Sequence, residues 1–396
     1  MNSETQKDKT RLLQEFQREL RAVGMASGNL ASALKEAEEE LRPYFENPDL
    51  LSKALGIGAM TYEHSFLRAK RSEPWVAEGV RSILSDFRNA RIRNNDLCLK
   101  TWGDWVQSTD RAISNVGSVA ILQVEKRGLE PHLLVKSTLR ELADILEGSL
   151  KSFARLRLKM LEIDGLRKSG RKPVEELSFG EIIDELILKV GDREMYSPPP
   201  FRIAASQWRN IANHNSYDTK GDCVTCSYGM PGKQKTFNCS PQNIFDVACY
   251  FNDLCYVHKV AIEIFGVDNM AGWSMSSPEL AITEFTKDAT LAFGLVSAGF
   301  EICYATQRGN MWRLALKDEY ERDKSAAKAA LQEAVCSYTL MNGVAHIEAA
   351  VYSKNVTHRI DFASSISKNQ NPPSPDFRGD IFDLDKNFRP VPRNRN

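Results

Sequence analysis

The sequence predicts a mainly α-helical protein with a helical N-terminal region, a helical bundle that contains a β-hairpin, and a small C-terminal α/β domain. Apolar residues recur at spacings of three and four through most of the first two thirds of the chain, which is the repeat of amphipathic helices. The last third changes to short strand-forming runs separated by Gly and Asn. We therefore divide the chain into regions 1–125, 126–268 and 269–364 and a Pro-, Asn- and Asp-rich tail, 365–396, that we expect to be disordered.

Composition restricts the partners and the compartment of the protein. The 396 residues include 52 basic and 52 acidic side chains, so a nucleic acid would have to be held by a local basic patch. The N-terminus lacks the apolar core of a signal peptide, and the apolar stretch Leu291–Ala298 is far shorter than the ~20 residues of a membrane span. Eight cysteines without a secretory signal are typical of reduced thiols. These features predict a cytoplasmic protein that does not enter a membrane.

The N-terminal region shows helical spacing but no chemical motif. Its helical segments are the stripe Leu12, Leu13, Phe16, Leu20 and Val23, the segment Trp75–Phe87, and the segment Trp102–Val119. We expect a helical scaffold or an interaction region here.

The bundle is expected to contain four helices. A long one runs from His132 to Met160, and a second begins at Ser178, where Glu181 completes a capping-box pattern. A short third helix follows three prolines and should end at Asn213, because poor helix formers come next. The remaining elements are a hairpin of Cys223–Tyr228 with Lys235–Cys239 and a fourth helix after Ser240-Pro241, whose apolar face is Ile244, Val247, Phe251, Leu254, Cys255, His258, Ile262 and Phe265. On this face His258 is expected to be a core residue rather than a ligand.

The C-terminal domain is expected to follow the order αββαββ. A helix from Ser277 to about Gly299 precedes two hairpins, which turn around Gly309-Asn310 and around Asn355, and the helix Ser325–Met341 lies between them.

Arg209, Asn210 and His214 form the group of residues with the most chemical content. If the third helix ends near Asn213, His214 can turn back towards the side of Arg209. A guanidinium can hold a phosphate through two hydrogen bonds, and an imidazole can move a proton near neutral pH. The pair therefore suits phosphodiester chemistry.

This stretch resembles the HEPN domain family, whose members carry Arg, usually a polar residue, and then His four to six positions later. Arg209-Asn210-Ile211-Ala212-Asn213-His214 matches that motif, and the long first helix, the helix beginning at Ser178 and the hairpin before the last helix match the surroundings. The resemblance covers residues 126–268, about a third of the chain.

The resemblance implies a metal-independent endoribonuclease that acts as a homodimer and needs no cofactor. The RNA 2′-hydroxyl would attack the adjacent phosphate, with His214 as general base or acid and Arg209 stabilising the charge that develops on phosphorus. Asn210 would position Arg209 or a phosphate oxygen. Tyr217 lies three residues after His214 rather than two, which argues against the nucleotide-modification role of a tyrosine in related toxins. By family analogy, the role would be in a toxin or antiphage defence system, with an inhibitor or sensor partner bound through the flanking domains. The alternative is a non-catalytic HEPN-like module for dimerisation or for binding nucleotides or RNA.

Two other groups of residues, a basic cluster and a set of cysteines, could bind RNA or a metal. Arg155, Arg157, Lys159, Arg167, Lys168, Arg171 and Lys172 form a basic cluster, and we expect Arg167, Lys168, Arg171 and Lys172 to guide RNA unless the cluster is only a solvated face. Cys223, Cys226, Cys239 and Cys249 suggest zinc, but residues three apart on a strand point to opposite faces, so no metal site is expected. A zinc-stabilised RNA-binding module remains a third possibility. Walker, GxGxxG, GxSxG and HExxH motifs are absent from the sequence.

Overall fold

The computed structural model describes residues 7–22, 30–56, 60–105, 108–109, 111–112, 129–167, 172–229, 232–269, 284–308, 311–335, 344–353 and 356–365. The protein is mainly α-helical, as predicted, with a three-stranded and a five-stranded sheet in these ranges. No helix within them combines the length and the apolar character needed to cross a membrane. The expected tail, apart from its first residue, and the helical ends expected at 113–119, 277–283 and 336–341 lie outside the described residues.

The chain forms two compact units, and each is built from separated segments. The sheet unit consists of Met1–Ala37, Leu55–Tyr62 and Thr286–Asn396, and the helical unit consists of Glu38–Ala54 and Glu63–Phe285. This division differs from the expected boundaries near 125 and 268. The expected N-terminal region is shared between the two units, because part of it pairs with the C-terminal strands and part of it packs within the bundle.

The helical unit contains the four helices expected for the bundle and others that precede them. The long first helix is α7 (Pro131–Asp144), a π-helical turn η2 (Ile145–Leu150) and α8 (Lys151–Ile163). The other three expected helices are α9 (Phe179–Val190), α10 (Ala205–Asn213) and α11 (Pro241–Asp268). The additional helices are η1 (Arg42–Tyr44), α3 (Pro48–Gly56), α4 (Thr61–Ala69), α5 (Pro74–Arg93), a helix at 95–105 and the short η3 (Val174–Glu176) before α9. Four helices contribute residues to both units, namely α2 (Leu30–Leu41), α3, α4 and α13 (Glu284–Ser297).

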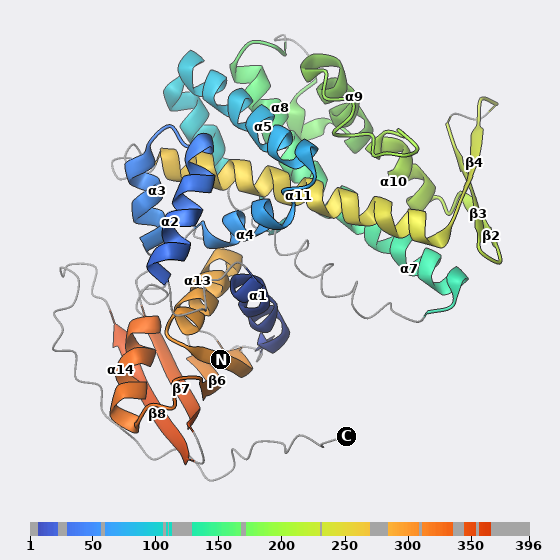
Figure 1. The fold of residues 1–396 in the computed structure, drawn as a ribbon. Helices are drawn as coiled ribbons and strands as arrows, with labels where there is room; N and C mark the ends of the chain where they lie inside the picture. The colour runs from blue at the N-terminus through green and yellow to red at the C-terminus, as the bar shows by residue number, and fades with distance from the viewer. Residues whose placement is uncertain are drawn as a thin grey trace, which may run out of the picture. The chain divides into compact units, whose positions relative to one another are not determined.

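Helix α11 forms the centre of the helical unit, and Figure 1 shows it running the length of this unit. It packs against α5, α7, η2 and α8. Every residue of its predicted apolar face is buried. Between Leu254 and Ile262 the opposite side is buried as well, because helices cover α11 from more than one direction. The predicted capping box of Ser178 with Glu181 is present at α9, and a second one, Ser240 with Asn243, caps α11 at the start that the sequence predicted.

Arg157 on α8 is a fully buried charge that joins three parts of the helical unit. Its guanidinium donates to Asp86 of α5 at 2.6 Å and to Asp192 in the segment after α9 at 2.7 Å. It also donates to the hydroxyls of Ser82, at 2.8 Å, and Tyr196, at 3.3 Å. A buried charge requires such partners, because its desolvation is otherwise uncompensated.

His258 on α11 is a core residue, as expected, and extends this polar network. Its ring is fully buried and stacks on Phe153, and its Nε2 lies 3.1 Å from the Tyr196 hydroxyl. Burial, with a further contribution from the Arg157 cation, lowers the pKa of His258 well below 6.5. The ring is therefore neutral in the folded protein near pH 7.

The sheet unit places its strands in the order β1-β5-β6-β7-β8. β5 (Phe300–Arg308) with β6 (Met311–Asp318), and β7 (Val344–Ser353) with β8 (Val356–Ser365), are the two predicted hairpins. β6 and β7 are parallel, so the chain crosses between them through α14 (Lys324–Ala334). The remaining elements are β1 (Lys7–Asp8), α1 (Thr10–Ala22) and α13 (Glu284–Ser297).

The N-terminal segment is held on β5 by glutamine side chains of α1. Gln17 donates to the carbonyl of Phe300 at 3.1 Å and accepts from the N–H of Ile302 at 2.9 Å, while Gln14 donates to the Ile302 carbonyl at 2.9 Å. β1 pairs antiparallel with β5 beside them. These bonds attach the start of the chain to a strand close to its end.

We predict that the substitution His258→Gln reduces the pH dependence of folding stability. The unfolded state binds a proton near pH 6.5 and the folded state does not, so stability falls as the pH drops below that value, by up to about 1.4 kcal/mol per pH unit. Urea unfolding of the parent and the variant at pH 7.5 and 5.5, followed by circular dichroism, measures this loss. The control is His132→Gln, whose ring is exposed on α7. If the His258 variant lost as much folding stability between pH 7.5 and pH 5.5 as the parent does, the prediction would be contradicted.

Candidate functional site

Helix α10 carries Arg209 and ends directly before His214, as predicted. The backbone N–H of His214 bonds to the Asn210 carbonyl at 3.0 Å, and the N–H of Ser216 bonds to the Ile211 carbonyl at 3.1 Å. Asn215 between them has a φ of 50°, the left-handed conformation that asparagine tolerates better than most residues. This is a Schellman-type end, which stops the helix and turns the chain into β2.

The surroundings of α10 fix its position in the helical unit. It packs against α7, the π-turn η2 and α9 on one side and against strand β3 on the other. The strands β2 (Tyr217–Lys220), β3 (Cys223–Tyr228) and β4 (Lys235–Cys239) form one antiparallel sheet. The sequence predicted the β3–β4 hairpin but not β2, which pairs with β3 immediately after the helix end. The motif thus lies where the bundle meets a small sheet.

Arg209 forms an ion pair that the sequence analysis did not anticipate. Its Nε lies 3.0 Å from Oε1 of Glu147 in the π-turn, and Lys151 donates to the other oxygen of Glu147 at 2.8 Å. The Arg209 side chain is 22% exposed, and its guanidinium, the buried Nε included, forms no hydrogen bond with the described residues. The guanidinium is therefore held by its charge contact with Glu147 and keeps its N–H donors for a ligand.

His214 and Asn210 complete the predicted set, and neither side chain forms a hydrogen bond with Arg209. The imidazole is exposed and forms no hydrogen bond or ion pair with the described residues, and Asn210 is half-buried. The helix end therefore presents the imidazole to solvent, and within the described part of a single chain it is not hydrogen-bonded to the guanidinium. The arrangement offers a cation that is fixed in place and a proton carrier that is free to engage a ligand.

The signal for Glu147 and Lys151 in the sequence is weak. Gly148 and Ser149 interrupt the long helix with poor helix formers, and the π-turn lies at this point. The spacing of Glu147 and Lys151 also allows an ion pair along one helix. Neither signal identifies Arg209 as the partner, because that contact is between helices.

The described residues of the basic cluster do not form the exposed surface that was predicted to guide RNA. Arg167 is buried, with 2% exposure, and donates to Glu162 at 2.7 Å and Glu185 at 2.9 Å, so its charge is not available to RNA. Lys172 is exposed and faces Glu181 at 3.3 Å, whereas Lys168 and Arg171 lie outside the described residues. Of the other cluster members, Arg157 is buried in the network described above, Lys159 faces Glu162 and Glu175, and Arg155 donates to the Leu177 carbonyl.

The cysteines of the hairpin are separated as strand geometry predicts. Cys223 is exposed and Cys226 is buried on the opposite face of β3. A hydrogen bond with Cys239, together with burial, raises the pKa of Cys226. Among the residues that the structure describes, no group of three or more His, Cys, Asp or Glu side chains is arranged to hold a metal ion.

We predict that iodoacetamide labels Cys223 at least about tenfold faster than Cys226 in the folded protein, because Cys226 is buried and its pKa is raised. Mass spectrometry after timed labelling measures both rates, with the exposed Cys303 as an internal reference and the urea-unfolded chain as the control. Protection of both Cys223 and Cys226 by one equivalent of zinc would contradict this description of the hairpin.

No family model, curated protein or solved structure matches this chain. The function is therefore inferred from the residues of the site itself.

Proposed function

We propose that the protein is a HEPN-like endoribonuclease that cleaves RNA at the end of α10. The observation that carries the proposal is the helix end between Arg209 and His214, which leaves guanidinium NH2 groups and an exposed imidazole at one end of a helix. A guanidinium can donate hydrogen bonds to two phosphate oxygens, and an exposed imidazole can exchange protons with a bound hydroxyl.

In the proposed reaction the RNA 2′-hydroxyl attacks the adjacent phosphorus and expels the 5′-oxygen of the next nucleotide. The products are a 2′,3′-cyclic phosphate and a 5′-hydroxyl. His214 takes the proton of the attacking hydroxyl or gives one to the leaving oxygen, and Arg209 stabilises the negative charge that grows on the phosphoryl oxygens. Asn210, one residue from Arg209, is assigned to positioning.

A second copy of the chain fits this chemistry. One imidazole can serve as base or as acid at a given moment, and among the described residues of one chain no hydrogen bond joins His214 to Arg209. Two copies that share a site would supply a base, an acid and two guanidinium groups to one phosphate. We therefore propose a homodimer, and a role in toxin or antiphage defence remains a proposal by family analogy.

The ion pair with Glu147 favours the alternative, a non-catalytic HEPN-like module. In that case Arg209 serves to join α10 to the π-turn, and the Arg–His motif has a structural role. The two functions differ in whether Arg209 binds phosphate.

Cleavage should depend on His214. In the full-length protein with a chelator present, His214→Ala is expected to lower the rate of RNA cleavage by about 10²–10⁴-fold, because the proton carrier is lost. Products with a 2′,3′-cyclic phosphate end, and no cleavage of 2′-O-methyl RNA, identify attack by the 2′-hydroxyl. The control His132→Ala removes an exposed histidine of α7 and should leave the rate unchanged. An undiminished rate in the His214 variant, or no cleavage by the parent, would refute the nuclease.

Removal of the Glu147 charge should strengthen phosphate binding if Arg209 contacts RNA. Glu147→Gln frees Arg209 and Lys151 from a competing carboxylate, and we expect about two- to fivefold tighter binding of 2′-O-methyl RNA, as for other partly exposed ion pairs. Fluorescence anisotropy at low salt measures the affinity. The matched control is Glu176→Gln, which removes one exposed carboxylate elsewhere in the same unit. Equal affinities of the two variants would favour the non-catalytic module.

A further inference from the structure

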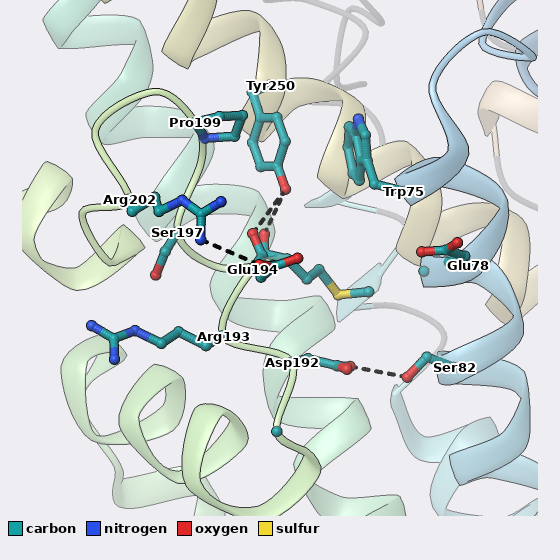
Figure 2. A pocket seen from close by; sticks show the side chains of 13 residues that line it. Trp75, Glu78, Ser82, Asp192, Arg193, Glu194, Ser197, Pro199, Arg202 and Tyr250 are labelled. Atoms are coloured by element: carbon teal, nitrogen blue, oxygen red, sulfur yellow. Dashed lines mark hydrogen bonds and ion pairs between the residues drawn. The ribbon is translucent and has the colours of Figure 1, made fainter.

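A cavity of about 770 Å³ lies in the helical unit, away from the residues of the Arg–His motif (Figure 2). Three parts of the unit form its walls, namely one face of α5, the segment 191–202 and the side of α11 that carries Tyr250. The residues of α5 that line it are Trp75, Glu78, Gly79 and Ser82, which share one helical face. A volume of this size is typical of small-molecule sites.

The walls of the cavity are fixed by contacts within the helical unit. At the base, the carboxylate of Asp192 accepts from Ser82 at 2.9 Å and from the buried Arg157 at 2.7 Å. The Tyr250 hydroxyl donates to the carbonyl of Met195 at 3.1 Å, which ties the segment 191–202 to α11. Gly79 leaves room for the Met195 side chain of this segment, because an added Cβ would lie 2.8 Å from its Cε. The cavity is thus formed before any ligand binds.

An aromatic pair forms one side of the cavity. The rings of Trp75 and Tyr250 stack with centroids 4.3 Å apart and an angle of 25° between their planes. The indole N–H of Trp75 is already bonded to Glu73 at 3.1 Å, so the ring offers the cavity its π-system rather than a donor. Both side chains are half-buried, as expected for a wall that a ligand could contact.

The charge beside this aromatic pair is negative. Glu78 is exposed and forms no hydrogen bond or ion pair with the described residues, and Figure 2 shows it on α5 below Trp75. Burial raises the pKa of Tyr250, and neighbouring anionic groups that include Glu194, Glu73 and Asp253 raise it further. Glu73 and Asp253 are both paired with Lys70, at 3.1 Å and 2.5 Å, so the carboxylate of the cavity lining that keeps its charge for a ligand is that of Glu78.

The two arginines of the lining, Arg193 and Arg202, do not form an ion pair with Glu78. Arg202 is already paired with Glu194, its Nη1 lying 3.3 Å from Oε1. Arg193 extends away from α5 in Figure 2, on the far side of the segment 191–202. The two cations of the lining thus belong to the segment 191–202, whereas Glu78 and Trp75 belong to α5 (Figure 2).

We propose that this cavity binds a small organic cation, with its ammonium group between the Glu78 carboxylate and the Trp75–Tyr250 pair. The quadrupole of an aromatic ring attracts a cation, most strongly for Trp, and a carboxylate without a partner adds a direct charge interaction. Either an aliphatic amine or a quaternary ammonium compound carries this chemistry. The proposal is independent of RNA cleavage at His214.

Calorimetric titration of the full-length protein at low ionic strength tests the site, with spermidine as the amine and choline as the quaternary ion. We expect saturable binding of at least one, and about fivefold or more weaker binding in Glu78→Gln. That side chain is exposed, so the substitution should not disturb folding. The control Glu176→Gln makes the same change in net charge and should bind like the parent.

The variant Trp75→Leu separates the two kinds of cation. Choline has no N–H to donate to a carboxylate, so its affinity should fall more than that of spermidine, by about five- to tenfold if the ring face is used. Circular dichroism confirms that the variant is folded. The proposal is overturned if neither cation binds saturably, or if Glu78→Gln and Glu176→Gln bind with equal affinity.

Discussion

The buried guanidinium of Arg157 is the interaction on which the helical unit depends most. It satisfies carboxylates from α5 and from the segment after α9, and through the Tyr196 hydroxyl it connects to the ring of His258 on the central helix. Loss of one partner in such a network leaves an uncompensated buried charge, which typically costs about 3–5 kcal/mol. The network therefore does more than add stability, because it determines where the segment 191–197 lies against α5.

Both sites of the helical unit follow from this constraint. First, the segment anchored by Arg157 forms a wall of the cavity that Trp75 and Glu78 also line. Second, the carbonyl of Tyr196 in this segment accepts a hydrogen bond from the N–H of Ala205 at 2.8 Å, which fixes the position of the first residue of α10. Arg209 lies one turn further along the same helix, where the π-turn brings Glu147 to it. The candidate nuclease site and the candidate cation site thus share one scaffold while using different side chains.

The sequence was informative wherever the deciding interaction is local. The predicted features that depend on residues a few positions apart are all present. They are the capping box at Ser178, the start of α11 after Ser240, the end of α10 at Asn213 and the hairpin strands. It was misleading for Arg167, which looks like a surface cation in sequence but is buried between two carboxylates. Glu147 was missed, and the division into units differed from the expected boundaries, for a related reason. Contacts between helices and pairing of distant strands are set by the tertiary arrangement, which no spacing rule encodes.

The attachment of the first residues to β5 has a consequence for biosynthesis. Lys7 pairs with Gln307, so β1 cannot find its partner until 300 further residues have left the ribosome. At ordinary elongation rates of about 5–20 residues per second, that interval is roughly 15–60 s. Residues 63–285 of the helical unit are synthesised before β5, so this unit can fold while the amino-terminal segment has no strand to pair with. During that time α1 presents apolar side chains such as Leu13 and Phe16, buried in the finished protein, to whatever chaperone or nascent neighbour is near.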